Sequence, residues 1–232
     1  MIKRVFVFMM LALMAAMFFK LVANYQERDE LSKLGTYYAE QAPAELGAAN
    51  LVTSVIVTYR GLDTLGEVTV LFLAAAGVGL LLKPDNNANN GTVKPIHRPA
   101  SEIVTTATEL LLPMVILLGV YVFINGHLSP GGGFQGGAII ASGTMFLMLA
   151  LPETHISRVM ISFIESLSGF SYVIVGTLGV VLAGGFLDNR ILPLGDYGTL
   201  FSAGAIPLIY VFVGLKVGFE LSAILDRFRK QD

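Results

Sequence analysis

Residues 126–137 read Gly-His-Leu-Ser-Pro-Gly-Gly-Gly-Phe-Gln-Gly-Gly, and they lie between two long apolar runs. Glycine adopts positive φ at little steric cost and lets another backbone approach closely, so this stretch predicts a sharp bend. Pro130 fixes its own φ and is expected to stop the incoming helix. Between two segments of membrane length, the stretch therefore predicts a turn at the edge of a bilayer.

The composition indicates a membrane protein. The 232 residues are 54% hydrophobic and only 14% charged, whereas soluble domains carry about 25% charged residues. The net charge of −2 gives no basic surface for nucleic acid. Without cysteine the chain forms no disulfide and no cysteine-bound zinc or iron–sulfur site. Three scattered histidines show no metal-ligand spacing, so we expect neither a metal nor a cofactor (His97, His127 and His155).

Six segments are apolar enough to cross a bilayer, which takes about 20 residues. They lie at about 5–23, 64–82, 103–124, 133–151, 168–187 with a leader from 158, and 198–225. The sequence therefore predicts an all-α, polytopic membrane protein. The first span also has the basic start of a signal peptide. Because its apolar core runs to about nineteen residues and no clear cleavage site follows, we expect a retained anchor.

Lys and Arg lie mostly at the chain ends and in every second connection between the predicted spans. This distribution predicts that both termini are cytoplasmic. Lys3 and Arg4 precede the first span, and the turn between the third and fourth spans contains no Lys or Arg. The chain closes with further basic residues (Arg227, Arg229 and Lys230). Three others depart from the alternation (Arg28, Lys33 and Arg190).

A polar stretch rich in Asn, Gly and Pro, residues 84–99, divides the chain into a two-span part (1–83) and a four-span part (100–232). Residues 48–59 are apolar and rich in β-branched side chains. As a helix they would rise only about 18 Å, too little to cross. They predict a short interfacial or re-entrant segment.

Ionisable side chains near the start of the second span are candidates for an ion path. Asp63 and Glu67 are four residues apart and so share a helix face, and Arg60 can pair with Asp63. A charge inside a span costs at least about 2.5–3.5 kcal/mol, so it usually faces a partner or water. The alternative is an interfacial ion pair with Glu67 at the headgroups.

Lys216 and Glu220 repeat the four-residue spacing in the last span, and Glu109 lies in the third. A Lys–Glu pair inside a bundle suits a proton relay. The alternatives are a neutralising pair whose lysine snorkels, and a Glu109 side chain that reaches the interface.

Three interpretations of the glycine-rich stretch stay open. A phosphate cradle is weak, because no Gly-Lys-Ser/Thr follows. Helix packing is supported by a small-residue face on the fourth span (Gly136, Gly137, Ala141 and Gly143). An ion-path element is possible where irregular backbone lines a cavity. The fifth span carries glycines that predict packing on other helices, and so many small faces suggest partner subunits (Gly176, Gly179, Gly184 and Gly185).

Two motifs resemble those of one family. The stretch 126–137 resembles the signature of MnhB, the B-type component of Mrp-type multisubunit sodium/proton antiporters, which also occurs in membrane-bound hydrogenases. The stretch 59–67, Tyr-Arg-Gly-Leu-Asp-Thr-Leu-Gly-Glu, resembles the carboxy-terminal extension of MrpA, which is a separate small protein (MbhE) in the hydrogenases.

The resemblance implies a fused subunit, with an MbhE-like module at 1–83, a polar linker at 84–99 and an MnhB-like module at 100–232. It implies that Asp63 and Glu67 belong to an ion-translocating region, and Lys216 lies in a stretch that also resembles the family. Together with the spacing arguments above, the ion-path candidates are Arg60, Asp63, Thr64, Glu67, Glu109, Lys216 and Glu220. The resemblance implies loop and packing residues at Pro130, Gly131, Gly132, Gly133, Phe134, Gly136 and Gly137.

The resemblance also implies partners of the A, C, D, E, F and G types, lipid around the chain, Na+ and H+ as transported ions, and the cell membrane of a prokaryote. The expected function is that of a subunit of a sodium/proton antiporter, without a catalytic centre of its own. One alternative is the equivalent subunit of a redox-driven, hydrogenase-type complex. Another is a small permease that works alone.

Overall fold

The structure is a computed structural model that describes residues 2–25, 30–82, 100–152 and 157–229. The predicted linker at 84–99 lies outside these ranges, as do His97 and His155. The described residues form helices, turns and loops, with no strand among them.

The chain forms two compact units, residues 1–37 and residues 38–232. The first contains α1 (Ile2–Ala23), whose apolar side chains are exposed along the helix. Helix α2 (Lys33–Leu46) begins in the first unit and continues into the second.

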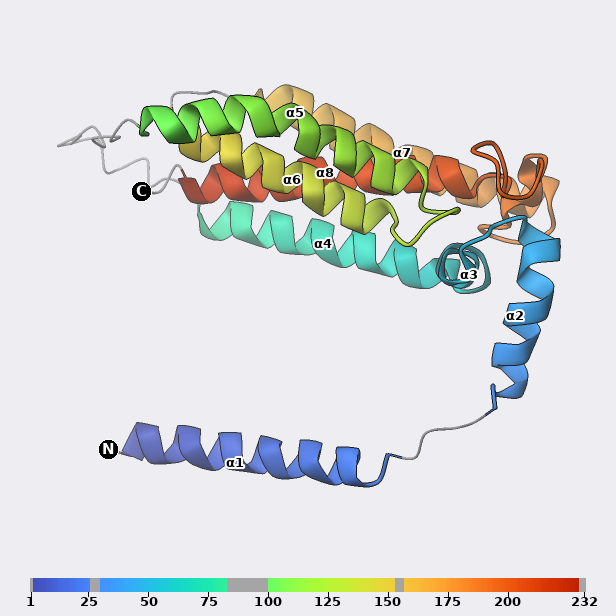
Figure 1. The fold of residues 1–232 in the computed structure, drawn as a ribbon, viewed down its shortest axis with the longest axis horizontal. Helices are drawn as coiled ribbons and strands as arrows, with labels where there is room; N and C mark the ends of the chain where they lie inside the picture. The colour runs from blue at the N-terminus through green and yellow to red at the C-terminus, as the bar shows by residue number, and fades with distance from the viewer. Residues whose placement is uncertain (1, 26–29, 83–99, 153–156, 230–232) are drawn as a thin grey trace. The chain divides into compact units, whose positions relative to one another are not determined.

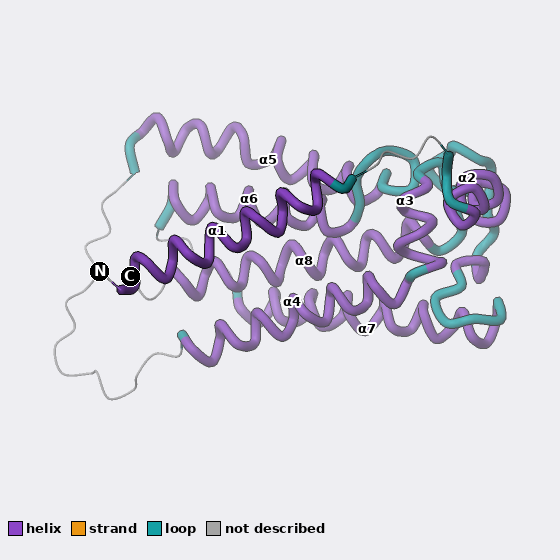
Figure 2. Tube along the Cα trace, turned by 90° about the horizontal axis from the view of Figure 1, so that it is seen from below, coloured by secondary structure: helices purple, strands orange, loops and turns teal. Residues whose placement is uncertain are grey.

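The second unit is a bundle of helices arranged around α8. Its elements, in chain order, are α3 (Leu51–Ser54), the π-helix η1 (Val55–Tyr59), α4 (Gly61–Leu81), α5 (Glu102–Ile124), α6 (Gly133–Ala150), α7 (Arg158–Leu182), the 3-10 helix η2 (Asn189–Ile191) and α8 (Ile206–Arg229). Helices α4, α5, α6 and α7 all pack on α8, and Figures 1 and 2 show the five running side by side. Helix α8 therefore contains more buried residues than any other described helix.

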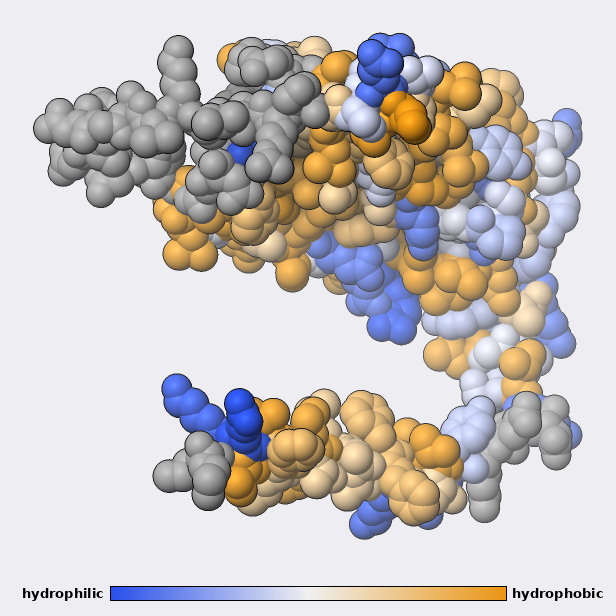
Figure 3. Space-filling model, turned by 60° about the vertical axis from the view of Figure 1, so that its left-hand side comes forward, coloured by the Kyte–Doolittle hydropathy of each residue, from blue (hydrophilic) through white to orange (hydrophobic). Residues whose placement is uncertain are grey.

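Six described helices are long and apolar enough to cross a membrane, which confirms the predicted all-α, six-span architecture. Apolar side chains cover much of the face shown in Figure 3. A helical bundle with such a surface is a multi-pass membrane protein. The cytoplasmic location of both termini stays a prediction.

Two predicted boundaries were wrong. The fifth span begins at Arg158 and ends at Leu182, before Gly184, whose φ is 100°. The sixth begins at Ile206 instead of 198, because Gly198 (φ 82°) and Gly204 (φ 58°) have left-handed backbone. In both places glycine allows a turn that an apolar composition does not reveal.

The short segment at 48–59 forms α3 and η1 and is not a span. The Asn50 side chain starts it by accepting from the backbone N–H groups of Val52 (3.1 Å) and Thr53 (3.4 Å). It continues as a π-helix whose end is marked by a bond from Arg60 N to Val55 O, 2.7 Å. The segment stops there, and α4 begins at Gly61.

Helix α2 was not predicted, since its sequence is polar and holds Pro43 within the helix. The part in the second unit is fixed by tertiary contacts. Ala42 and Leu46 are buried, and Tyr38 stacks on Tyr59 with ring centroids 4.8 Å apart. Tertiary packing, and not helix propensity, holds this helix.

Candidate functional site

The glycine-rich stretch is a turn between α5 and α6, but Pro130 does not stop α5. Helix α5 ends at Ile124, and Asn125 O accepts the backbone N–H groups of Leu128 and Ser129, both at 2.9 Å. These bonds close the turn before the proline is reached. Pro130 is exposed and precedes the start of α6. The expected role of Pro130 was therefore wrong.

The glycines at the start of α6 mark close contacts with neighbouring backbone. A Cβ added to Gly136 would lie 2.6 Å from Gly119 O of α5, and one on Gly137 would lie 2.8 Å from Gly214 O of α8. One on Gly133 would lie 2.7 Å from Val213. Gly136 and Gly137 require glycine because a Cβ does not approach a backbone oxygen so closely, and Gly133 requires it because the Val213 side chain fills the space. The other candidates border the same contacts, since Gly132 lies beside Tyr210, Gly131 beside Val122, and Phe134 on the core.

Gly176 and Gly179 were predicted to pack on other helices, but they pack on the loop that follows α7. A Cβ added to Gly176 would meet Leu187 at 2.9 Å, and one on Gly179 would lie 2.5 Å from Gly185 O. Both neighbours belong to the loop that follows α7. The small-residue face of α7 at Gly176 and Gly179 therefore packs on the loop that follows this helix.

Asn50 and Thr53 of the first part of the chain hold the glycine-rich turn. Asn50 Nδ2 donates to Gly126 O and Ser129 O, both at 2.9 Å. Thr53 Oγ1 donates to Gly126 O at 2.7 Å and lies 2.9 Å from the Tyr210 hydroxyl of α8. The turn is thus fixed by polar contacts from a segment more than seventy residues earlier in the chain.

His127 is buried in this turn. Its Nε2 lies 3.3 Å from Thr199 O, and its Nδ1 has no hydrogen-bond partner among the described residues. Burial lowers the pKa of His127 below its ordinary value of 6.5, because the charged form loses its hydration. The side chain is therefore a neutral packing element near pH 7.

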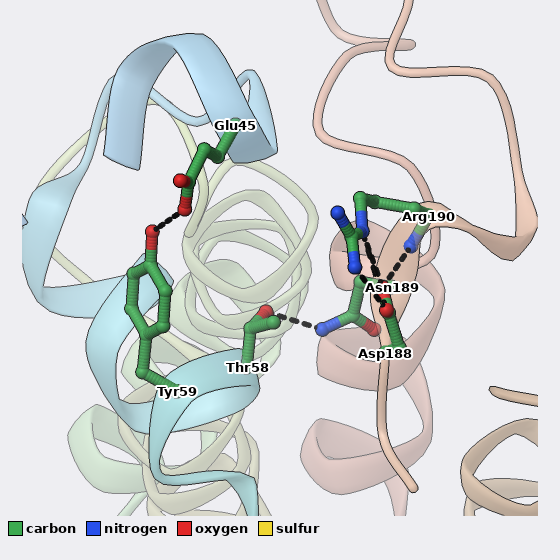
Figure 4. A network of polar contacts seen from close by, with 6 residues as sticks. All are labelled: Glu45, Thr58, Tyr59, Asp188, Asn189 and Arg190. Atoms are coloured by element: carbon green, nitrogen blue, oxygen red, sulfur yellow. Dashed lines mark hydrogen bonds and ion pairs between the residues drawn. The ribbon is translucent and has the colours of Figure 1, made fainter. Parts of the chain in front are cut away.

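Polar contacts also join η1 to the loop after α7, as Figure 4 shows. Asn189 Nδ2 donates to Thr58 Oγ1 at 2.5 Å, and the Tyr59 hydroxyl donates to Glu45 at 2.5 Å. Arg190, an exception to the charge alternation, donates to the Asp188 carboxylate through Nε at 2.9 Å. This bond holds the pKa of Asp188 below its ordinary value.

On α4 the structure brings Arg60 and Asp63 together and leaves Glu67 apart. The Arg60 guanidinium lies 2.5 Å from the Asp63 carboxylate, and the two side chains are 64% and 49% exposed. Glu67 is exposed one turn further along. Thr64 is buried and donates to Ile56 O at 2.8 Å, so it fixes α4 to η1. Of the four, Thr64 alone turns away from the exposed side.

Lys216 and Glu220 lie inside the bundle. Lys216 Nζ is 3.2 Å from Glu220 Oε2 and 3.4 Å from Glu165 Oε1 of α7. The Glu220 side chain is fully buried and that of Lys216 is 9% exposed, so the lysine does not snorkel to the surface of this chain. Lys216 Nζ also lies 5.1 Å from the centroid of the Phe72 ring.

Glu165 was missed by the sequence analysis, although a signal was present. It is an acidic side chain within an otherwise apolar helix, and such residues usually have a partner. Glu109, by contrast, is on the exposed side of α5 and contacts neither member of the Lys216 ion pairs.

Six candidate spans, five of them in one bundle that has one charged group inside it and another on its surface, define a polytopic membrane protein. A family model described as a domain related to the MnhB subunit of Na+/H+ antiporter matches residues 103–223. A second model, which describes the E component of MBH (MbhE), matches residues 3–102. The chain belongs to the MnhB-related family, which confirms the resemblance.

Two solved structures are similar over nearly the whole chain. One is a chain of the membrane-bound sulfane sulfur reductase (MBS), an archaeal respiratory membrane complex, with 40% identity, a TM-score of 0.82 and 98% of both chains covered. The other is a chain of the Mrp complex from Dietzia sp. DQ12-45-1b, with 27% identity and a TM-score of 0.76. That match covers 97% of this chain but 26% of the Dietzia chain.

A third relative is the B-type component of the Na(+)/H(+) antiporter of Bacillus subtilis (strain 168). It is 35% identical over 81 residues, which are 35% of this chain and 51% of the relative. This chain thus spans about half the length of that antiporter component. The match is restricted to part of each protein, whereas the similarity to the reductase chain extends from end to end.

Proposed function

We propose that this chain is an integral membrane subunit of a multisubunit cation/proton antiporter complex in a prokaryotic cell membrane. The observation that carries the proposal is the family match over residues 103–223, together with the structural similarity to the Mrp complex chain. The chain supplies part of an ion route and of the contacts between subunits, and it has no catalytic centre of its own. Its partners are the other Mrp-type subunits, of the A, C, D, E, F and G types.

An exposed carboxylate on α4 indicates that another subunit or water contacts this helix. Glu67 is six residues into a candidate span that begins at Gly61, about 9 Å along the helix, and its side chain is exposed. A carboxylate facing lipid there costs at least about 2.5–3.5 kcal/mol. The side of α4 that bears Asp63 and Glu67 therefore faces a partner subunit or a water-filled route. The same reasoning disfavours a permease that works alone.

Within this proposal Asp63 and Glu67 form part of a hydrated cation route between this chain and a neighbouring subunit, with Na+ and H+ as the exchanged ions. The Arg60–Asp63 pair holds one carboxylate in place, which leaves Glu67 as the group available to a passing ion. The two carboxylates keep the route negative, which favours cations.

The test is ion transport by the purified complex in lipid vesicles. We expect Glu67→Gln to reduce cation-dependent proton movement strongly while the complex still co-purifies intact. Glu102→Gln, which changes an exposed carboxylate at the start of α5, is the matched control and should transport normally. Normal transport by the Glu67→Gln complex would place the cation route elsewhere.

A second candidate function is the equivalent subunit of a redox-driven respiratory complex. The observation that favours it is the similarity to the sulfane sulfur reductase chain over 98% of both chains. Identifying the proteins that co-purify with this chain decides between the two. Redox metalloproteins among them, with ion movement that requires an electron donor, would support the second candidate.

A further inference from the structure

Glu165 joins Lys216 and Glu220 in a group of three charged side chains inside the bundle, which we call the α7–α8 triad. Lys216 forms an ion pair with each carboxylate, at 3.4 Å to Glu165 and 3.2 Å to Glu220. The side chains are 17%, 9% and 0% exposed for Glu165, Lys216 and Glu220. Lys216 and Glu220 lie well inside α8, at least nine residues from either helix end, which is about 14 Å of helix.

The triad contains two carboxylates and a single ammonium group, so its net charge is −1 when all three groups are ionised. Glu220 Oε1 is buried and has no hydrogen-bond partner among the described residues. Among the described residues, Glu220 Oε2 has only the ion pair with Lys216. A buried negative charge that is not balanced is strongly unfavourable. The triad therefore needs one more positive charge.

The geometry favours a proton over a metal cation. Cation sites inside membrane bundles draw on unwound backbone carbonyls, whereas Glu165 and Lys216 belong to regular helices whose carbonyls are bonded internally. Lys216 Nζ already contacts both carboxylates, and the Phe72 ring lies against it. A proton needs only one carboxylate oxygen. We propose that the triad binds a single exchangeable proton, held by Glu165 or Glu220 while Lys216 balances the other carboxylate.

A small polar cavity lies near the triad, on the side toward the end of α8. It has a volume of about 80 Å³, and its lining includes Ser162, Asp226 and Arg227. Ser162 is three residues from Glu165, and lining residue Ala223 is three residues from Glu220, so the cavity lies about one helical turn from the triad. The cavity has polar partners and room for water.

Other charged groups near α8 do not balance the triad. On α4 and α5 they are exposed (Asp63, Glu67, Glu102 and Glu109), and α6 has none. On α8 itself, Asp226 pairs with Arg229 at 2.9 Å, and Arg227 donates to Ala75 O at 2.5 Å. The proton binds reversibly to a carboxylate oxygen, with no other bond made or broken. As a proton site of the antiporter complex, the triad rests on the proposed function.

The experiment is infrared difference spectroscopy of the intact complex in lipid, between acidic and alkaline pH. A protonated carboxyl group gives a C=O band that disappears on ionisation. We expect Glu165→Gln and Glu220→Gln each to lose the band of one such group, because either change leaves one carboxylate balanced by Lys216. The exposed control Glu102→Gln should retain it. Addition of sodium at constant pH should leave the band unchanged.

Retention of the full band in both glutamine variants would overturn the proposal. Displacement of the band by sodium at constant pH would also overturn it and would identify a cation site instead. If a glutamine variant does not assemble, Glu165→Asp and Glu220→Asp keep the carboxyl groups, and at least one of them should shift the band; a band that shifts in neither variant would overturn the proposal. If the complex shows the band but no cation exchange in vesicles, the antiporter function is rejected. The proposal of a proton site at the triad would stand.

Discussion

Helices α4 and α8 each carry two ionisable side chains four residues apart, but in opposite surroundings. Asp63 and Glu67 are exposed on α4, whereas Lys216 and Glu220 are buried on α8. The difference comes from the neighbours. Four long helices pack on α8, while α4 packs on α8 and η1 and leaves its other side open. Residue spacing thus identifies a shared helix face, but the packing decides whether that face is a core or an interface.

The largest expected effect comes from removing the positive charge of the buried group. Lys216→Met would leave the buried Glu220 and the partly buried Glu165 without an ammonium, and breaking a buried pair in this way costs about 3–5 kcal/mol. Arg60→Met, which breaks the exposed pair on α4, should cost about 0–1 kcal/mol. Thermal unfolding of the full chain in detergent measures both. Equal losses would show that the two groups are equally buried in the assembled protein.

Glycine-to-alanine changes compare the packing around α8 with that of α4 without changing any charge. Gly137→Ala would put a Cβ 2.8 Å from Gly214 O of α8, and such overpacking costs about 1–3 kcal/mol. Gly77→Ala on α4 meets nothing within 4 Å and should stabilise the helix by about 0.5–1 kcal/mol. The same unfolding measurement compares them. A neutral Gly137→Ala would contradict the close contact of α6 with α8.

Much of the fold could be predicted because it depends on composition. Six long apolar segments give six helices, and the glycine-rich stretch lies at the turn between two of them. The loop boundaries at 183–205 could not be predicted, since apolar residues there continue through left-handed glycine turns. Helix α2 was missed because its stability comes from contacts such as Tyr38 on Tyr59.

For the candidate site, sequence spacing identified Lys216 with Glu220, which are on one helix. It did not identify Glu165, which is 51 residues away from Lys216 and meets it only when α7 packs on α8. Nor did it show that Asp63 and Lys216 would differ in burial. Both depend on which helices are neighbours, and that information is not local in the sequence.

The smallest expected effect is a pH dependence at the glycine-rich turn. The pKa of His127 is lowered in the folded chain, so the unfolded chain binds more protons once the pH falls below about 6.5. Stability should therefore decrease as the pH falls through this range and be unaffected by His127 above it. His127→Gln, which does not titrate, should lack this component. Parallel pH profiles for the two chains would show that His127 is protonated equally in both states.

The hydrogen bonds of Asn50 imply that one gene or two separate genes could encode this protein. Its oxygen starts α3, and its nitrogen holds Gly126 and Ser129, more than seventy residues further along the chain. Thr53 adds bonds to Gly126 and Tyr210. Residues 1–83 and residues 100–232 thus recognise each other through side-chain and backbone contacts of the folded chain. These contacts do not require one continuous polypeptide. A gene divided within codons 83–99 should yield two polypeptides that co-purify, and Asn50→Ala should weaken their association.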